Sequence, residues 1–325
     1  MFGGTNKTIS IVYNDFALSL LAVTKGELEQ ALTYQIPLEK GIVKNGMIED
    51  EDAFFNTLKD VLKKKKIKRY DVRMVAPANS TVMKKINLPA HLTTIEQVEE
   101  YIEAEMNDSI RVPFSDPLYD IYDEDPSDGE ALLFASEREE ITKVVDLMDD
   151  LDLDLQIVDL KYLADLRIVE KVIPNFYSQT MLVLDWSMDQ LLISIINNGK
   201  LELNREYTLR TDHEDWSEII SNEEVEFKLT QNKEAYEIQI HDALNEIDQI
   251  VHFYQYSLNK GTAEIHRVIN IGDHPMLTEI DELIEGKVSL QTSRITDADI
   301  NAYFPGFKAK HSTLLGLAIK GGYKE

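Results

Sequence analysis

Two segments of this chain follow the same order of strands and turns. The first begins at Thr8 (TISIVYNDFALSLLAVTKGELEQALTYQIPL) and the second begins 172 residues later, at Thr180 (TMLVLDWSMDQLLISIINNGKLELNREYTL). Each has an apolar strand, a turn containing Asp, a second apolar strand, a Gly turn and a third strand. Aliphatic runs bounded by Gly, Asn and Asp are typical of strands. The repeat predicts two related halves; the alternative is that any two three-stranded meanders look alike.

Helical patterns follow each meander. Residues 51–66 carry apolar side chains at helical spacing, and residues 216–257 are predicted to be mostly helical. Strands that alternate with helices indicate an α/β or mixed architecture. Further strands are predicted at 72–77, 118–122, 131–136, 155–158, 268–271 and 288–290, and further helices at 95–106, 138–148, 160–173, 275–284 and 311–320, the last closed by Gly321-Gly322.

Length and composition limit the class of protein. A chain of 325 residues predicts about two domains. It contains no cysteine, which excludes disulfides, thiol nucleophiles and Cys-based zinc sites and fits a reducing compartment. The first ten residues lack the pattern of a signal peptide, and no apolar run is long enough to cross a bilayer. We therefore expect a soluble, cytoplasmic protein.

The chain is strongly acidic. Its 33 basic and 59 acidic residues give a net charge of −26. Such a surface repels phosphate backbones and anionic lipid, which argues against nucleic acid as a partner and against direct membrane insertion. A basic or membrane-anchored protein is the partner that this charge favours.

The stretch from Ile86 to Tyr122 carries a family resemblance. It reads INLPAHLTTIEQVEEYIEAEMNDSIRVPFSDPLYDIY, with Leu88-Pro89 before an acidic helix and Val112-Pro113-Phe114 after it. This arrangement resembles the PilM family of type IV pilus assembly proteins, and later segments, such as Leu315-Gly316-Leu317-Ala318 in the last helix, follow in the family's order. The resemblance implies a mixed α/β, actin-like (ribonuclease H-like) two-domain fold with an inserted subdomain of the FtsA/PilM type.

The same resemblance implies that the chain is divided into four subdomains. The first actin-like domain would take residues 1–85 and 155–178, with residues 86–154 as the inserted subdomain. The second would take 179–212 and 262–325, with residues 213–261 as a mostly helical subdomain.

Nucleotide binding in this fold needs turns whose backbone N–H groups cradle phosphates, and glycine lets the backbone come close. The family has Asp-Ile-Gly-like sequences at two of these turns. This chain has Tyr13-Asn14-Asp15-Phe16 and Asp185-Trp186-Ser187-Met188 instead, and Arg210-Thr211 replaces a pair of glycines. The adenosine-side glycines are reduced to Gly272-Asp273-His274-Pro275. Added bulk and added carboxylates therefore predict that ATP binding is weakened or lost.

If a nucleotide site survives, the resemblance implies Mg-ATP as the cofactor; otherwise the chain has none. Asp15, Asp185 and Asp189 could hold Mg²⁺ through water. No catalytic residue is assigned. The cofactor-binding candidates are Asn14, Asp15, Asp185, Ser187, Gly272 and Asp273, and the metal candidates among them are Asp15 and Asp185.

The function implied is that of a cytoplasmic adaptor in a type IV pilus, type II secretion or competence-pseudopilus machine, held at the inner face of the membrane by a protein partner. That partner would be the N-terminal cytoplasmic tail of a PilN-like bitopic membrane protein, with the motor ATPase and the platform protein as further candidates. The tail would lie between the first domain and the inserted subdomain, in a groove built around Leu88, Tyr101, Glu105, Val112, Pro113 and Phe114.

Two alternatives stay open. The first is a working ATPase or nucleotide switch of the same fold, in which Asp15 and Asp185 hold Mg²⁺ and orient water. The second is a cell-division adaptor of the FtsA type. That family ends in a linker and a membrane-binding amphipathic tail, whereas this chain stops at Glu325, directly after its last predicted helix.

Three other motifs have a simpler interpretation beside the functional one. Lysines 63–66, with Lys68 and Arg69, could bind anionic lipid or an acidic partner, but cations at a helix C-terminus also favour the helix dipole. The aspartates at 150, 152 and 154 have the spacing of a calcium loop, but Leu and Lys replace its required Gly and Glu. Trp186 and Trp216 could fill an emptied nucleotide site or simply pack in a core.

Overall fold

The first meander and two later strands form one five-stranded sheet. The computed structural model describes residues 7–24, 27–106, 108–221, 224–287 and 290–320 and gives the order β10-β6-β1-β2-β3. Neighbours among β1, β2 and β3 are antiparallel, whereas β6 runs parallel to both β1 and β10. The strands are β1 (Thr8–Tyr13), β2 (Ala17–Val23), β3 (Leu32–Pro37), β6 (Asp71–Val75) and β10 (Asp154–Asp159).

The second meander builds a sheet with the same plan. Its order is β13-β12-β11-β16-β17, so three antiparallel strands again lie beside two parallel ones. The predicted turn at Asn198-Gly199 has both residues in the left-handed region, with φ of 51° and 83°; the predicted turn at 25–26 lies outside the described residues. The strands are β11 (Thr180–Trp186), β12 (Gln190–Asn197), β13 (Lys200–Thr208), β16 (Arg267–Gly272) and β17 (Gln291–Arg294).

Helix α1 (Glu51–Lys65) follows the first meander after a short hairpin of β4 (Val43–Lys44) and β5 (Met47–Ile48). The Asp50 side chain caps its N-terminus by accepting from the Ala53 N–H at 2.9 Å. The helix ends where Lys66 turns into the left-handed region at φ 58°. Phe54, Leu58 and Leu62 form its buried stripe, as the helical spacing of its apolar residues predicts.

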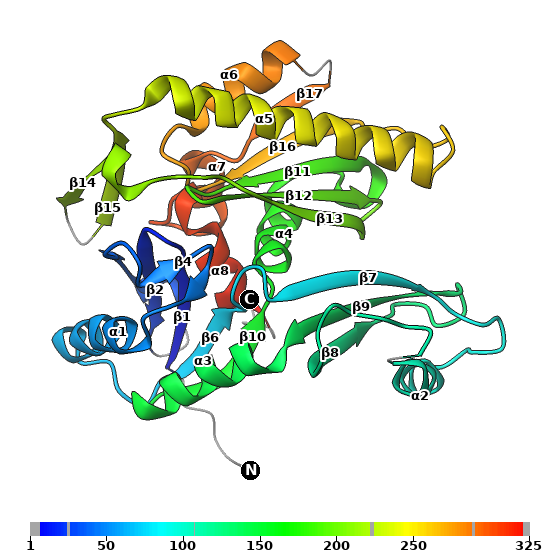
Figure 1. Ribbon diagram of the computed structural model, residues 1–325, viewed down its shortest axis with the longest axis horizontal. Coiled ribbons are helices and arrows are strands. Elements are labelled where there is room, and N and C mark those ends of the chain that lie inside the picture. The colour runs from blue at the N-terminus through cyan, green and yellow to red at the C-terminus, as the bar shows by residue number, and fades with distance from the viewer. Residues whose placement is uncertain (1–6, 25–26, 107, 222–223, 288–289, 321–325) are drawn as a thin grey trace. The chain divides into compact units, whose positions relative to one another are not determined.

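Two helices cross where the halves of the larger unit meet. They are α4 (Lys161–Val172) and α8 (Ser312–Ile319), labelled side by side in Figure 1. The crossing is close because residue 316 is glycine: a methyl group placed there would lie 2.0 Å from the Ala164 carbonyl oxygen. The predicted closing glycines at 321–322 lie outside the described residues.

Residues 216–257 are less helical than the sequence pattern predicted. They begin with a hairpin of β14 (Trp216–Ser221) and β15 (Glu224–Leu229), and only then enter α5 (Lys233–His252) and a π-helical turn at Phe253–Leu258. The missed signal is the alternation of charged and apolar residues in EVEFKL, which has the period of a strand. Figure 1 shows α5 running across β11, β12 and β13, where its apolar stripe joins the main core.

The chain after β16 holds α6 (Leu277–Lys287), β17 and α7 (Asp297–Tyr303). The strand predicted at 288–290 falls largely on residues 288–289, which lie outside the described residues. Helix α7 was not predicted. Its start is fixed by a capping box, in which the Thr296 hydroxyl accepts from the Asp299 N–H and the Asp299 carboxylate accepts from the Thr296 N–H.

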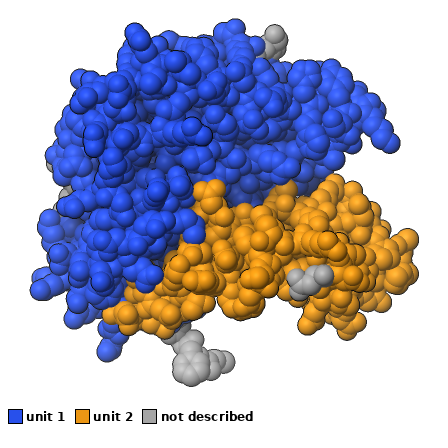
Figure 2. Space-filling view, viewed as in Figure 1, with its two compact units in different colours: residues 1–75, 151–325 blue, residues 76–150 orange. Residues whose placement is uncertain are grey.

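The chain divides into two compact units, coloured separately in Figure 2. Residues 76–150 form one unit, inserted in the sequence between β6 and β10, and the rest of the chain forms the other. The finer division into four subdomains stays a prediction. The elements of the inserted unit are β7 (Thr81–Asn87), α2 (Ile95–Glu105), β8 (Pro117–Tyr122), β9 (Glu130–Glu137) and α3 (Arg138–Asp150).

The inserted unit is built on a three-stranded antiparallel sheet in the order β7-β9-β8. Helix α2 packs on one face, where its Val98 and Ile102 join a core with Ile86, Leu133 and other buried residues. Side chains alternate along β9, so Leu132 and Phe134 belong to the opposite face and are only partly buried. This unit therefore has one filled face and one apolar face that is partly exposed.

The close crossing of α4 and α8 predicts that Gly316→Ala destabilises the protein. The added methyl group must displace backbone, so we expect the free energy of unfolding to fall by about 1–3 kcal/mol. Gly286→Ala is the matched control, because a methyl group there meets nothing within 4 Å and should leave stability unchanged or raise it by up to about 1 kcal/mol. Urea denaturation measures both; equal stabilities would contradict a tight crossing.

Candidate functional site

The first predicted phosphate turn uses its own amide groups. The Asn14 side-chain oxygen accepts from the N–H groups of Phe16 and Ala17 at 2.9 and 2.8 Å, and the Asn14 N–H donates to the Ala17 carbonyl at 3.0 Å. The Asp15 N–H donates to the Asp189 carboxylate at 3.1 Å. All four amides from 14 to 17 therefore have protein acceptors, whereas a phosphate cradle needs such groups to point at the ligand.

The Asp15 carboxylate is also engaged. It accepts from the N–H groups of Asn45 and Gly46, in the turn between β4 and β5, at 2.9 and 2.8 Å. The Asp15 carbonyl contacts the His213 ring nitrogen at 2.8 Å. Asp189, in the other half, is buried beside it, and burial together with the Asp15 charge raises the pKa of Asp189 to about 7. The two halves of the larger unit thus meet directly at these turns, and the space around Asn14, Asp15, Asp185 and Asp189 is the cleft between the halves.

The adenosine-side turn is closed against the second phosphate turn. The N–H groups of Asp273 and His274 both donate to the Trp186 carbonyl at 3.1 Å. Gly272 permits this approach, because its φ is 126° and a Cβ there would lie 2.1 Å from that carbonyl oxygen. Ser187 donates its N–H to the Gln190 carbonyl at 2.9 Å and is buried. These turns also bind each other through their backbone.

Between the turns lies Lys161, at the start of α4. Its ammonium is 3.2 Å from Asp165 and forms a direct ion pair with Asp185. Burial alone would lower the pKa of Lys161, but the carboxylates of Asp165 and Asp185 raise it above its ordinary value. The sequence reasoning missed Lys161; its signal was the Lys-x-x-x-Asp spacing, which places both side chains on one helix face.

Three further carboxylate atoms add to this acidic cluster. One oxygen each of Asp185, Asp189 and Asp273 is buried and has no hydrogen-bond partner among the described residues. Burial raises the pKa of Asp273 as well. Among the described residues, no three acidic or histidine side chains are arranged to hold a metal ion. Asp15 and Asp185, the predicted Mg²⁺ ligands, are instead bound to backbone amides and to Lys161.

Two cavities of very different volume adjoin these turns. A recess of about 30 Å³ touches Asn14, Ser187, Asp273 and Lys161. A single water needs about 10–15 Å³ on the same measure, so this recess is too small for a triphosphate. A larger cavity of about 660 Å³ shares Asn14 and Asp273 with it and falls in the size range of ligand sites. Of the six predicted cofactor residues, the recess and the Lys161 ion pair bring together Asn14, Asp185, Ser187, Gly272 and Asp273.

The two tryptophans are packed in the core of the second half. Trp186 is fully buried, and Trp216 meets the rings of Tyr236 and His274 edge-on, with centroids 5.5 and 5.9 Å apart. His274 is hydrogen-bonded to the Tyr236 hydroxyl, and its Nδ1 accepts from the Met276 N–H at 3.0 Å. Aromatic side chains therefore pack against His274 of the adenosine-side turn.

The predicted groove residues lie in the inserted unit, several of them in its core. Leu88 is buried there, and Tyr101 and Val112 pack against the same core. Glu105 accepts a hydrogen bond from the Ser109 hydroxyl at 2.5 Å. Phe114 is partly buried and Pro113 exposed. Their role in binding a partner stays a prediction.

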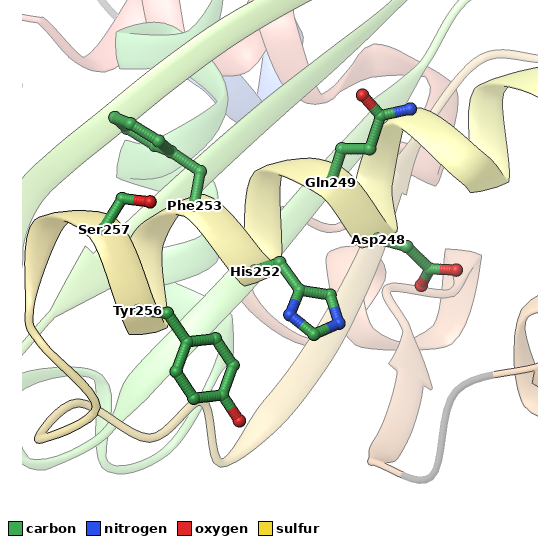
Figure 3. A pocket seen from close by; sticks show the side chains of 6 residues that line it. All are labelled: Asp248, Gln249, His252, Phe253, Tyr256 and Ser257. Carbon is green, nitrogen blue, oxygen red and sulfur yellow. The ribbon is translucent and has the colours of Figure 1, made fainter.

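Two surface features lie away from the cleft. Lys63, Lys64, Lys66 and Lys68 are exposed around the end of α1 and form no ion pair among the described residues. A shallow hollow of about 500 Å³ lies along the end of α5, lined by the residues in Figure 3. There His252 and Tyr256 stack on one side of the helix with centroids 5.4 Å apart, and Phe253 extends from the other.

The paired sheets, the crossing helices and the cleft define the actin-like class of fold. A solved PilM–PilN type IV pilus biogenesis complex matches with a TM-score of 0.72 over 97% of this chain and 98% of that chain, at 15% identity. The cytoplasmic domain of EpsL from the Vibrio cholerae type II secretion system matches at 0.50, 10% identity and coverage of 98% and 97%. MreB5 of Spiroplasma citri bound to ADP also matches at 0.50, with 10% identity and coverage of 97% and 96%.

The sequence names the family within this class. Residues 13–300 match the family model described as type IV pilus assembly protein PilM, so the chain belongs to the PilM family. Among curated proteins, none matches the sequence. The resemblance drawn from the segment at Ile86 and the predicted actin-like fold are thereby confirmed.

The buried His274 predicts a loss of stability in acid. Burial lowers the pKa of His274 from 6.5 to about 3, so below pH 6.5 the unfolded chain takes up a proton that the folded protein does not. Stability that is present above pH 6.5 is lost as the pH falls toward 3. Between pH 7 and pH 5 we expect a loss on the order of 1–2 kcal/mol from this residue.

Urea denaturation of the wild type and of His274→Asn at pH 7 and pH 5 measures this contribution. The variant has no titrating ring at residue 274, so its decrease in unfolding free energy between the two pH values should be smaller. The buried His311 contributes equally to both proteins and cancels in the comparison. Identical pH dependence would show that His274 is not the responsible group.

Proposed function

We propose that this protein is a pilus-machine adaptor that binds the extended cytoplasmic tail of a PilN-like membrane protein through residues 76–150, and that it does not turn over ATP. The family match and the likeness to a PilM–PilN complex support such a partner. The proposal that ATP is not turned over rests on one observation: Lys161 forms an ion pair with Asp185, the carboxylate predicted to bind Mg²⁺.

The sheet of the inserted unit offers a surface suited to an extended peptide. Strand β8 pairs only with β9 among the described residues, so no further strand covers its outer edge there. Along β8, Pro117 has no N–H and the Ile121 N–H donates to the Asp120 carboxylate at 2.9 Å. Tyr122 of β8 is 57% exposed and lies opposite Leu132, on the partly exposed face with Phe134. An added strand would gain backbone hydrogen bonds at this edge, and the side chains would supply specificity.

The acidic surface suits the expected tail. Cytoplasmic segments next to a membrane helix are commonly rich in Lys and Arg, and complementary charge speeds association. No helix in the described residues is long and apolar enough to span a membrane. We propose that the protein reaches the inner face of the membrane through its tail partner, with the motor ATPase and the platform protein as further candidate partners. The pilus, secretion or competence system that it serves stays a prediction.

A nucleotide-dependent switch is the second candidate function. The observation that favours it is the cavity of about 660 Å³ at the adenosine-side turn. Against it stand the small inner recess and the phosphate-turn amides that already have acceptors. If the switch operates, Mg-ATP must bind and must change the affinity for the tail, because coupling between two sites is reciprocal.

Calorimetric titration of a synthetic PilN-like tail, with and without Mg-ATP, tests both functions. We expect one tail per chain, an affinity unchanged by Mg-ATP, and no heat or thermal stabilisation from Mg-ATP alone. A true nucleotide site would raise stability by about 2.7 kcal/mol at a hundred times its dissociation constant. Mg-ATP binding that alters tail affinity would replace the adaptor with the switch, and absence of tail binding would refute the adaptor.

Two pairs of variants then place the tail. Tyr122→Asp should weaken tail binding at least tenfold if the tail adds to β8, because the variant puts a charge on the apolar face. Its control is Tyr177→Asp, because Tyr177 is 65% exposed in the other unit.

Glu105→Lys should weaken tail binding about threefold to tenfold if the tail follows α2, because the charge attraction is lost. Its control is Glu103→Lys, on the same helix and exposed.

A further inference from the structure

We propose that the Lys161 ammonium is the resident cation of the cleft, standing in for a divalent metal and joining the two halves of the larger unit without any ligand. The inference concerns this cleft alone and does not depend on tail binding. It goes beyond a lost nucleotide site, because it gives the cleft an occupant supplied by the chain itself.

The geometry places the ammonium between groups from both halves. Lys161 is the first residue of α4, which follows β10 of the first sheet, and Asp185 lies near the end of β11 in the second sheet. Asp165 approaches from one turn further along α4 and is held by the Thr313 hydroxyl of α8 at 2.7 Å. The Lys161 contact with Asp185 therefore crosses from one half to the other.

Burial raises the pKa of Asp165 and the charge of Lys161 opposes this rise, so a cation at this point favours the ionised carboxylates. Asp165 and Asp185 are each at most 3% exposed, and Asp273 also acts on Lys161 through its charge. Buried carboxylates without a counter-charge repel each other and carry a large desolvation cost. Lys161, with its side chain 16% exposed, is the cation that directly contacts Asp165 and Asp185 among the described residues. A tethered ammonium meets this need at every concentration of free metal.

A divalent ion does not fit the same place in this structure. Mg²⁺ requires near-octahedral oxygen ligands at about 2.0–2.1 Å, and no suitable group of three acidic side chains exists among the described residues. Direct contacts also join the halves nearby, through the Asp15 N–H on Asp189 and through His213 on the Asp15 carbonyl. The closed arrangement thus rests on the chain's own groups.

Chemical rescue of Lys161→Ala tests the proposal. Removing the ammonium should raise the unfolding equilibrium constant about 100- to 4,000-fold, since breaking a buried pair costs about 3–5 kcal/mol. Ethylammonium chloride should restore part of the lost melting temperature, and equal concentrations of sodium chloride or ethanol should not. Lys287→Ala, which removes an ammonium paired with Asp248 outside the cleft, is the control and should not respond to ethylammonium.

The results separate a resident cation from ordinary packing. Rescue by ethylammonium but not by ethanol supports the proposal. Equal effects of ethylammonium chloride, sodium chloride and ethanol would overturn it, as would an equal response of Lys287→Ala to ethylammonium.

If Lys161→Ala does not fold, Asp185→Asn provides a second measurement, because it weakens only the contact between halves. Hydrogen exchange in residues 8–23, which include the Asp15 amide bonded across the halves, should become at least tenfold faster than in the wild type. Exchange at the wild-type rate would overturn the proposal.

Discussion

The contact between Gly316 and Ala164 is the constraint on which the rest of the larger unit depends. Only a residue without a side chain lets α8 approach α4 so closely, and α8 also packs on β1, β2 and β6 of the first sheet. It also brings Thr313 of α8 onto Asp165 of α4, which positions Lys161 beside Asp185. One missing methyl group thus allows the backbone packing and the ionic contact that crosses between the halves.

The turns that would bind a nucleotide in this fold are present, but their backbone amides form hydrogen bonds within the protein. Backbone amides that would cradle phosphates bind Asn14, Asp189 and the Trp186 carbonyl instead. If the cleft binds no nucleotide, as we propose, the protein would present its partner surface at constant geometry whatever the nucleotide level of the cell.

The sequence predicted those structural features that produce a local pattern of residue types. Aliphatic runs located the strands of both sheets except β17, whose sequence QTSR is polar, and the glycine-poor turns at Asn14 and Asp185 predicted an altered cleft. The hairpin at Trp216–Leu229 was lost inside a longer helical assignment because its alternation is short. The Lys-x-x-x-Asp spacing relates Lys161 only to Asp165, whereas its contact with Asp185, 24 residues away on another element, is not visible in the sequence. Likewise, core packing of Leu88 and Val112 depends on the fold of α2 over its sheet, not on their own motif.

The insertion point of residues 76–150 has a mechanical consequence. The chain leaves the first sheet at the end of β6 and returns at the start of β10, and these strands are parallel neighbours in which Asp71 lies opposite Asp154 and Val75 opposite Asp159. The two attachment points therefore sit at opposite ends of one hydrogen-bonded ladder. A pull between them loads that ladder in shear, so its bonds resist together instead of opening one after another. An adaptor that couples a membrane anchor to a working machine would be strongest in this direction.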